Sequence, residues 1–298
     1  MNVILRAIVP VFSIVALGYV LGFFKELDTK TLSELTLYLL TPGLVFTSLM
    51  ESHILARRLL STVAFAFLIF AALALVSWTL TRLLRYTAAE TSGFVLSTTL
   101  MNCGNLGLPL IYFAFGTEGL AIAVIFLVCF VIILNTFGIF TAAGGHLPAA
   151  RALQEIYRLP ALYAIAFALL IKGFHLTIPP LLWKPIQMIG HAAIPIILIV
   201  LGIQLTHANL KDRLGRIGLA VGVRLLFTPV LAVLIFALLP ADALTRRVLI
   251  IQSSGPTAVN AVILATKYDT HPAFVSGVIL VSTVLSIFTL SGLLAIWG

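Results

Sequence analysis

Two short stretches combine amide and hydroxyl side chains with residues that interrupt helices. Residues 102–109 read Asn-Cys-Gly-Asn-Leu-Gly-Leu-Pro, and residues 252–260 read Gln-Ser-Ser-Gly-Pro-Thr-Ala-Val-Asn. Proline removes a backbone donor and disrupts the preceding turn, and glycine lowers helix propensity. A helix interrupted in this way presents backbone N–H groups and partial positive charge at the start of its second half. Such groups, together with neutral amides, are suited to binding a carboxylate.

Both stretches lie inside long apolar segments. Of the 298 residues, 61% are hydrophobic and 9% are charged, and the mean hydropathy is +1.17. A soluble domain carries about a quarter charged residues. The composition therefore excludes a cytosolic enzyme, a nucleic-acid-binding domain and a disordered chain, despite the formal net charge of +8. It predicts an all-α polytopic membrane protein, because backbone polar groups in lipid must be paired within the chain.

The apolar runs predict ten transmembrane helices, each close to the ~20 residues that a span requires. They are expected at residues 3–23, 32–50, 59–83, 91–114, 119–140, 159–175, 183–205, 217–239, 246–267 and 273–297. The two interrupted stretches then fall near the middle of helices four and nine. Thr87 and Glu90 have the spacing of a capping box before helix four, and Thr31 and Glu34 have the same spacing before helix two.

The two halves of the chain resemble each other in the placement of proline and glycine. The matched positions have a near-constant offset: Pro10 with Pro160, Pro42 with Pro195, and Gly104–Asn105 with Gly255–Pro256. Five helices per half place the second half in the opposite orientation, an arrangement that many secondary transporters share. We therefore expect one five-helix repeat over residues 1–141, a cytoplasmic amphipathic linker over 142–158, and an inverted repeat over 159–298.

Lysine and arginine are more numerous in the odd-numbered connections, which predicts that both termini lie outside and the linker inside. The short loops favour a prokaryotic inner membrane. No motif for a catalytic, metal or cofactor site is present, so we expect no enzyme activity, no cofactor and no nucleic-acid partner.

The candidate substrate-binding residues come from the interrupted stretches and from two other polar positions within spans. They are Asn102, Gly104, Asn105, Pro109, Ser253, Ser254, Gly255, Pro256, Thr257, Asn260, Arg224 and Asn135. An intramembrane charge such as Arg224 either serves function or snorkels to the membrane interface. Asn135 either faces the same cavity or bonds a neighbouring helix. The glycine, serine and asparagine residues also have a purely structural interpretation, since they allow helices to pack closely.

Several motifs together resemble the auxin efflux carrier family, particularly its short bacterial members related to malonate carriers. They occur in order at residues 9–19, 40–46, 102–110, 193–202 and 256–261. The resemblance implies crossed, unwound helices four and nine, as in bile-acid carriers. It also implies a scaffold of helices 1, 2, 6 and 7, expected to form a homodimer, and a moving transport part of helices 3–5 and 8–10.

The resemblance further implies an elevator-type secondary transporter of small organic anions, such as malonate, malate or auxin-like acids. Sodium-coupled relatives use acidic residues near the crossing, and this sequence has none there. A proton- or sodium-coupled symporter on the same fold is the alternative, followed by an anion channel.

Overall fold

A computed structural model describes residues 3–25, 27–52, 56–144, 160–208, 210, 212 and 214–298. Over these residues the chain is helical, apart from one antiparallel backbone bridge between Met101 and Thr257. The described α-helices are α1 (Val3–Phe24), α2 (Thr29–Leu35), α3 (Thr41–Glu51), α4 (Ala56–Leu83), α5 (Ala88–Thr99), α6 (Leu108–Ile133), α7 (Ile139–Ala142), α9 (Pro160–Gly173), α10 (Pro180–Thr206), α11 (Leu214–Gly222), α12 (Thr228–Leu238), α13 (Ala243–Ser253), α14 (Asn260–Lys267) and α15 (Pro272–Trp297). Four π-helical segments adjoin them: η1 (Thr36–Leu40), η2 (Cys103–Gly107), η3 (Leu134–Gly138) and η4 (Val223–Phe227). The predicted linker lies outside the described residues beyond Gly144.

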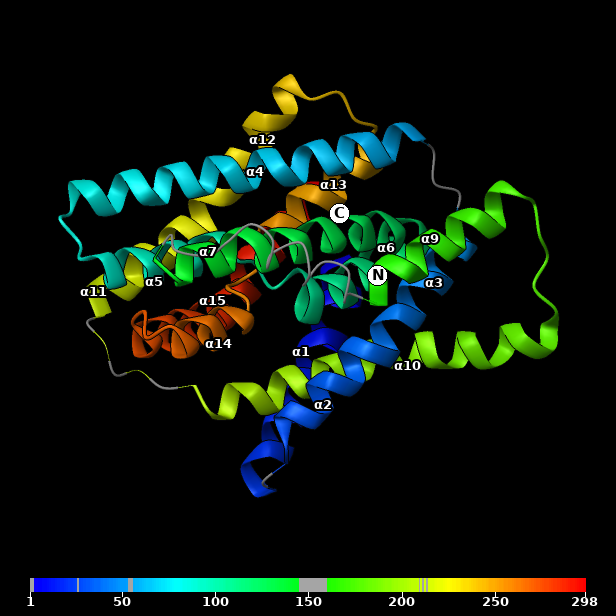
Figure 1. The fold of residues 1–298 in the computed structure, drawn as a ribbon, viewed down its shortest axis with the longest axis horizontal. Helices are drawn as coiled ribbons and strands as arrows, with labels where there is room; N and C mark the ends of the chain where they lie inside the picture. The colour runs from blue at the N-terminus through cyan, green and yellow to red at the C-terminus, as the bar shows by residue number, and fades with distance from the viewer. Residues whose placement is uncertain are drawn as a thin grey trace.

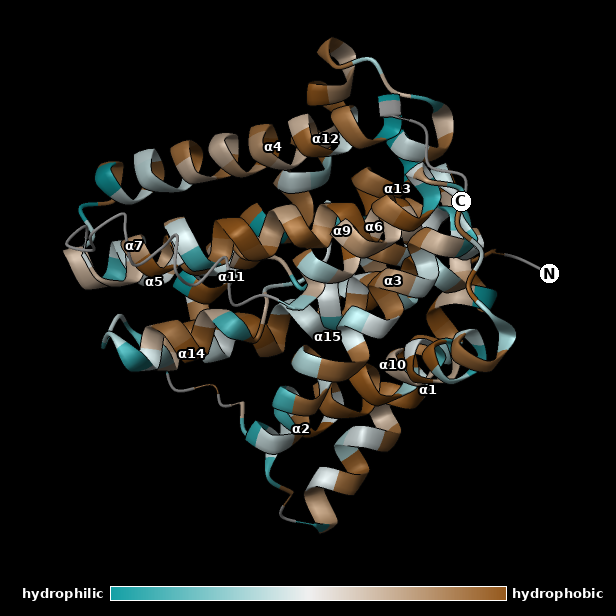
Figure 2. Ribbon diagram, turned by 45° about the vertical axis from the view of Figure 1, so that its right-hand side comes forward, coloured by the Kyte–Doolittle hydropathy of each residue, from teal (hydrophilic) through white to brown (hydrophobic). Residues whose placement is uncertain are grey.

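Seven described helical stretches are long and apolar enough to cross a membrane. They are Val3–Phe24, Thr29–Glu51, Arg57–Leu83, Cys103–Ala142, Pro180–Thr206, Leu214–Leu238 and Pro272–Trp297. Apolar residues cover most of each helix, and hydrophilic residues gather at helix ends and connections (Figure 2). The chain is therefore an integral membrane protein. The ten-span arrangement stays a prediction, because α9 has only 14 residues and α5 and α13 have 12 and 11.

The stretch Cys103–Ala142 is a hairpin. Its 40 residues would extend about 60 Å as one straight helix, twice the ~30 Å of the hydrocarbon core. The backbone leaves the helical conformation at Gly116, whose φ is +67°, a region that suits glycine. The two arms then lie together, since a Cβ at Gly104 would be 3.4 Å from Leu127 Cδ1. The turn separates the segments predicted as helices four and five.

The helices form two groups with α6 between them (Figure 1). In the first group α10 packs against both α1 and α3, and α9 packs against α3. In the second group α4 and α5 pack with α11 to α15. Helix α6 contacts α1, α3 and α10 on one side and α4 and α13 on the other. The boundary between the groups therefore runs along α6.

Glycines bring α1 and α10 into close contact. A Cβ at Gly202 of α10 would lie 2.1 Å from Val15 O, and one at Gly18 of α1 would lie 2.3 Å from Ile199 O. Small residues at such positions allow two helix backbones to approach where lipid provides no hydrophobic drive for association. The contact fixes the first helix group as one packed unit.

Three of the four π-helical segments are followed by proline. Pro42, Pro109 and Pro229 each occupy one of the first two positions of the next α-helix. Proline lacks an N–H donor and its ring clashes with the carbonyl four residues earlier, so the preceding turn widens. One of these wide turns, η2, falls on the first interrupted stretch of the sequence.

One of the two predicted capping boxes is present. Thr87 caps α5, and the Glu90 side chain bonds back to the Thr87 N–H group, as predicted. The prediction for Thr31 and Glu34 is wrong. The helix begins earlier, at Thr29, because Asp28 accepts a hydrogen bond from the Lys30 N–H group at 3.0 Å.

Glu90 joins this cap to a second element, because it also accepts a hydrogen bond from Arg216 of α11. The Thr87 N–H group, at 2.8 Å, and the Arg216 guanidinium lower the pKa of Glu90 from its usual 4.5 to about 2. Both interactions favour the ionised carboxylate.

We expect the Glu90 contacts to make stability depend on acid pH. A carboxyl group with a lowered pKa binds fewer protons in the folded chain than in the unfolded chain, so its contribution is complete above its unfolded pKa. That contribution is lost as the pH falls from about 4.5 to about 2. Thermal unfolding of the detergent-purified protein should therefore lose midpoint temperature more steeply over this window than Glu90→Gln does. Parallel curves for the two proteins would contradict the assignment, and Glu34→Gln serves as the control.

Candidate functional site

The two interrupted stretches meet and pair through their backbones. Helix α5 ends at Thr99 and helix α13 at Ser253, and the chain resumes helical structure at Cys103 and Asn260. Between these ends the Asn102 N–H group donates to Pro256 O at 2.7 Å, and the Ala258 N–H group donates to Leu100 O at 2.8 Å. These bonds satisfy backbone groups that the interruptions remove from helical pairing. We call this pairing of residues 100–102 with 256–258 the crossing.

Arg224 neutralises the carbonyl ends of both broken helices. It projects from η4, is 0% exposed, and is the largest fully buried side chain among the described residues. Its Nε donates to Gly255 O at 3.0 Å and its Nη1 to Thr98 O at 2.8 Å, and Nη2 donates to Ser253 O. These carbonyls lie at the C-terminal ends of α5 and α13, where helix dipoles place partial negative charge. The interpretation that Arg224 snorkels to the interface is therefore wrong.

Side chains around the crossing add hydrogen bonds to it. Thr257 Oγ1 donates to Ser97 O at 2.7 Å, and Gln252 Nε2 donates to Cys103 O at 2.8 Å. Gly107 makes room for the second contact, because a Cβ there would lie 2.5 Å from Gln252 Oε1. Polar residues of this stretch thus hold the two broken helices together.

We expect Arg224→Met to destabilise the folded protein strongly. The substitution leaves three buried carbonyl groups without their charged donor, and one unsatisfied buried acceptor costs about 1–3 kcal/mol. Arg224→Lys should retain part of the stability, since an ammonium keeps the charge but lacks the forked donor geometry. The midpoint of thermal unfolding in detergent should therefore fall in the order wild type, Arg224→Lys, Arg224→Met. Equal midpoints for wild type and Arg224→Met would show that the guanidinium does not support the crossing.

A cavity of about 170 Å³ lies beside the crossing, between the two helix groups. We call it cavity 1. One wall comes from α2, η1, α3 and α10, and the other from η2, α6, α14 and the crossing itself. None of the described residues that line it is charged. Its polar lining residues are Ser33, Thr36, Thr41, Asn102, Asn105, Gln204 and Asn260.

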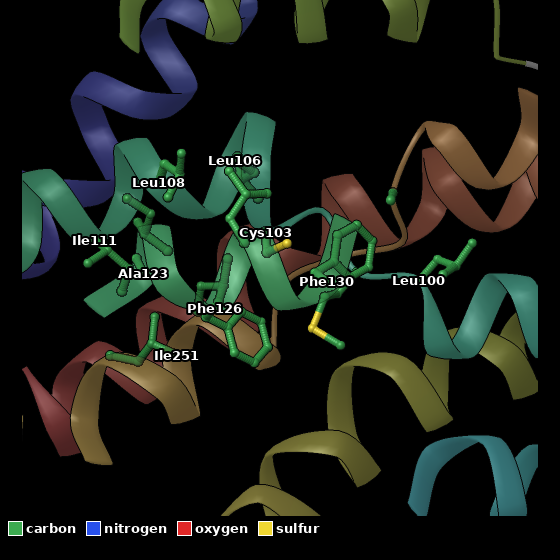
Figure 3. Packing of buried hydrophobic residues seen from close by; sticks show 14 of the residues in the cluster. Leu100, Cys103, Leu106, Leu108, Ile111, Ala123, Phe126, Phe130 and Ile251 are labelled. Atoms are coloured by element: carbon green, nitrogen blue, oxygen red, sulfur yellow. The ribbon is translucent and has the colours of Figure 1, made fainter. Parts of the chain in front are cut away.

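The apolar part of this wall belongs to the central hydrophobic cluster. Leu108 and Phe130 line cavity 1 and pack in the same cluster as Leu100 and Cys103 (Figure 3). Cavity 1 therefore offers neutral polar groups beside apolar surface, an arrangement typical of a small-molecule site.

Four of the predicted site residues line cavity 1. They are Asn102, Gly104, Asn105 and Asn260. Asn102 caps η2, since its Oδ1 accepts a hydrogen bond from the Asn105 N–H group at 3.1 Å. Its Nδ2 is buried and has no hydrogen-bond partner among the described residues, although Asn102 is only 3% exposed. Asn102 thus lines cavity 1 with an amide donor that no described residue uses.

The structure places the other predicted residues outside the cavity lining. Pro109 is the second residue of α6, and Asn135 Nδ2 donates to Val131 O within its own helix at 2.9 Å. Arg224 faces the carbonyl ends described above. The others form the buried break between α13 and α14: Ser253, Ser254, Gly255, Pro256 and Thr257.

Sequence reasoning missed the wall that the first helix group contributes. Ser33, Thr36, Thr41 and Gln204 come from α2, η1, α3 and α10. Gln204 carried a usable signal, because it is the one polar side chain in the run Ile-Leu-Ile-Val-Leu-Gly-Ile-Gln-Leu at residues 197–205. The three hydroxyl residues carried none, since hydroxyl groups are common in membrane helices.

Comparison with known proteins places the chain in a family. The profile of the family described as "Membrane transport protein" matches residues 3–148 and, a second time, residues 149–294. The chain belongs to this family. Both halves thus match one profile, and the protein is a membrane transporter rather than an enzyme.

The similar proteins carry transporter names. An "Uncharacterized transporter" of Methanothermobacter thermautotrophicus is 27% identical over 291 residues, covering 96% of this chain and 95% of the relative. A protein of Rhizobium meliloti named "Putative malonate transporter" is 28% identical over 311 residues, covering 96% and 93%. The similarity to each extends over almost the whole length of both proteins.

Proposed function

We propose that the protein is a secondary transporter of small organic anions, with malonate as the first substrate to test. The observation that carries the proposal is Asn102, which lines cavity 1 at the crossing and whose buried Nδ2 donor has no hydrogen-bond partner among the described residues. A carboxylate oxygen is its natural acceptor. The starts of η2 and α14 add partial positive charge to the same wall. The name of the Rhizobium meliloti relative supports malonate in particular.

The size and lining of cavity 1 favour a small solute with little net charge. Its volume of about 170 Å³ is below the ~300–1,000 Å³ that is usual for drug-sized ligands. Helix ends and neutral amides stabilise one negative charge without a buried counter-ion. Short-chain carboxylates meet both conditions.

A second cavity supports alternating access. It measures about 280 Å³ and lies along the same boundary between the helix groups, lined by α1, α3 and α10 on one side and by α6 on the other. Cavity 1 uses residues 33–41 and 197–204 of the first group, and the second cavity uses residues 44–51 and 191–195. Movement of one group along the other would let the crossing serve both cavities in turn, as in an elevator.

The two family matches support the rest of the architecture that we propose. Each match covers one half of the chain, in keeping with five-helix repeats over 1–141 and 159–298. An inverted relation between them would give ten spans, with both termini outside a prokaryotic inner membrane. The first helix group is the scaffold in this scheme, and the family resemblance makes it the contact surface of a homodimer.

Arg224 bears on ion coupling. Its guanidinium supplies fixed positive charge at carbonyl groups that would otherwise be ligands for a cation, which favours transport without a coupled metal ion. Proton coupling is the second candidate, because the titratable residues Glu51 and His191 line the second cavity. Uptake that responds to an imposed pH gradient but not to a sodium gradient would favour this candidate.

We expect purified protein in liposomes to take up labelled malonate saturably. Asn105→Ala and Asn260→Ala should each reduce uptake by about tenfold or more, because each removes a polar group from the wall that faces the substrate. Thr289→Ala in α15, which does not line cavity 1, is the control and should transport like wild type. Both asparagine variants must first match wild type in size-exclusion profile and thermal stability.

Two results would contradict this function. Unchanged uptake in both asparagine variants would show that the substrate does not bind at the crossing. If the wild-type protein transports no organic anion, with or without a membrane potential, the proposed substrate class is wrong.

A further inference from the structure

A second side chain in cavity 1 has an unused hydrogen-bonding atom, and its orientation is fixed by its neighbours. Ser33 Oγ donates its proton to Thr29 O at 2.7 Å, so this hydroxyl group is left as an acceptor. Gln204 must therefore turn its Nε2 group toward Ser33, and the two atoms lie 3.2 Å apart. Gln204 Oε1 is then buried without a hydrogen-bond partner among the described residues.

A neighbouring group also fixes the orientation of the Asn102 amide, but here the atom left without a partner is the donor. The Asn105 N–H group is a donor, so it selects Asn102 Oδ1 and leaves Nδ2 unused. Asn102 belongs to the crossing and Gln204 to α10 of the first helix group. Each wall of cavity 1 thus contains a residue with one buried, unpartnered atom: a donor in Asn102 and an acceptor in Gln204.

We infer that cavity 1 recognises its ligand at two points, a carboxylate at Asn102 and a hydrogen-bond donor at Gln204. A buried polar atom without a partner costs about 1–3 kcal/mol, and a ligand with a matching group removes that cost on both walls. The ligand is therefore a short carboxylate that carries a second group able to donate. This inference rests on the proposed function and adds a selectivity that a carboxylate site alone does not have.

Two kinds of group supply the donor. One is a hydroxyl group, as in a short hydroxy acid, and the other is the retained proton of a half-ionised dicarboxylic acid. Both present an O–H group to Gln204 Oε1 while the carboxylate faces Asn102. A fully ionised dicarboxylate presents only acceptors, so Gln204 Oε1 disfavours it.

The test is competition against labelled malonate uptake by the full-length protein in liposomes. In the hydroxyl arm, 3-hydroxypropionate is compared with butyrate, which replaces the hydroxyl by a methyl group. In the carboxyl arm, unlabelled malonate is compared with monomethyl malonate, which cannot donate, while the pH is lowered toward the range in which carboxyl groups titrate.

We expect 3-hydroxypropionate to inhibit at a concentration about tenfold or more below that of butyrate, as one unpaired buried acceptor predicts. Malonate should gain potency over monomethyl malonate as the pH falls if the second carboxyl supplies the donor. A preference in either arm supports the inference and names the source of the donor.

Gln204→Leu tests the residue assignment, because it removes the acceptor and keeps a side chain of similar size. The preference for donor-bearing competitors should disappear in this variant, while the Thr289→Ala control retains it. If Gln204→Leu does not fold, the wild-type comparison still decides the main point.

Three outcomes separate the claims. Equal potency within both pairs in wild type, with malonate still transported, overturns the inference and leaves the proposed function intact. A preference that survives in folded Gln204→Leu overturns the assignment to Gln204. The absence of uptake of any carboxylate overturns the proposed function itself.

Discussion

The structure depends on the need to pair every backbone polar group in an interior without water. Interrupting two helices near their middle releases N–H and C=O groups, each of which is costly to leave unpaired in an apolar interior. At the crossing, the Asn102 N–H group donates to Pro256 O and the Ala258 N–H group donates to Leu100 O. The Arg224 guanidinium donates to carbonyl groups at the C-terminal ends of the two helices that the breaks interrupt. The two breaks are therefore stabilised by pairing with each other and by a buried cation.

This arrangement assigns different roles to polar residues that look alike in the sequence. Thr257 Oγ1 and Gln252 Nε2 donate to backbone carbonyl groups of the partner stretch and hold the crossing together. Asn102 both caps η2 and keeps one donor unused. The opposite wall of cavity 1 belongs to the first helix group, so a solute bound there would contact both groups at once. A site shared in this way would couple binding to any movement between the groups.

Features that depend on neighbouring residues could be predicted from the sequence, whereas contacts between distant helices could not. Helix breakers and amides in an apolar run marked Asn102, Asn105 and Asn260, because such residues are unfavourable there without a purpose. The role of Arg224 was not readable, since its partners are backbone carbonyls, which every residue has. The prediction of a cap at Thr31 was wrong for a local reason, because Asp28 lies upstream and is the N-cap residue of α2. The wall formed by Ser33 and Thr36 arises only when distant helices pack, so no local sequence pattern predicts it.

The central claim is that the unused donor of Asn102 binds a carboxylate. Asn102→Asp tests it most directly, because the new side chain keeps an acceptor for the Asn105 N–H group and replaces the donor by an oxygen that bears negative charge at neutral pH. The measurement is calorimetric titration of 3-hydroxypropionate, a monocarboxylate with a hydroxyl donor, into detergent-purified wild type and variant at neutral pH. The account predicts a folded variant with the size-exclusion profile of wild type, in which binding of 3-hydroxypropionate is weakened by tenfold or more. Undiminished binding to a folded Asn102→Asp protein would contradict it.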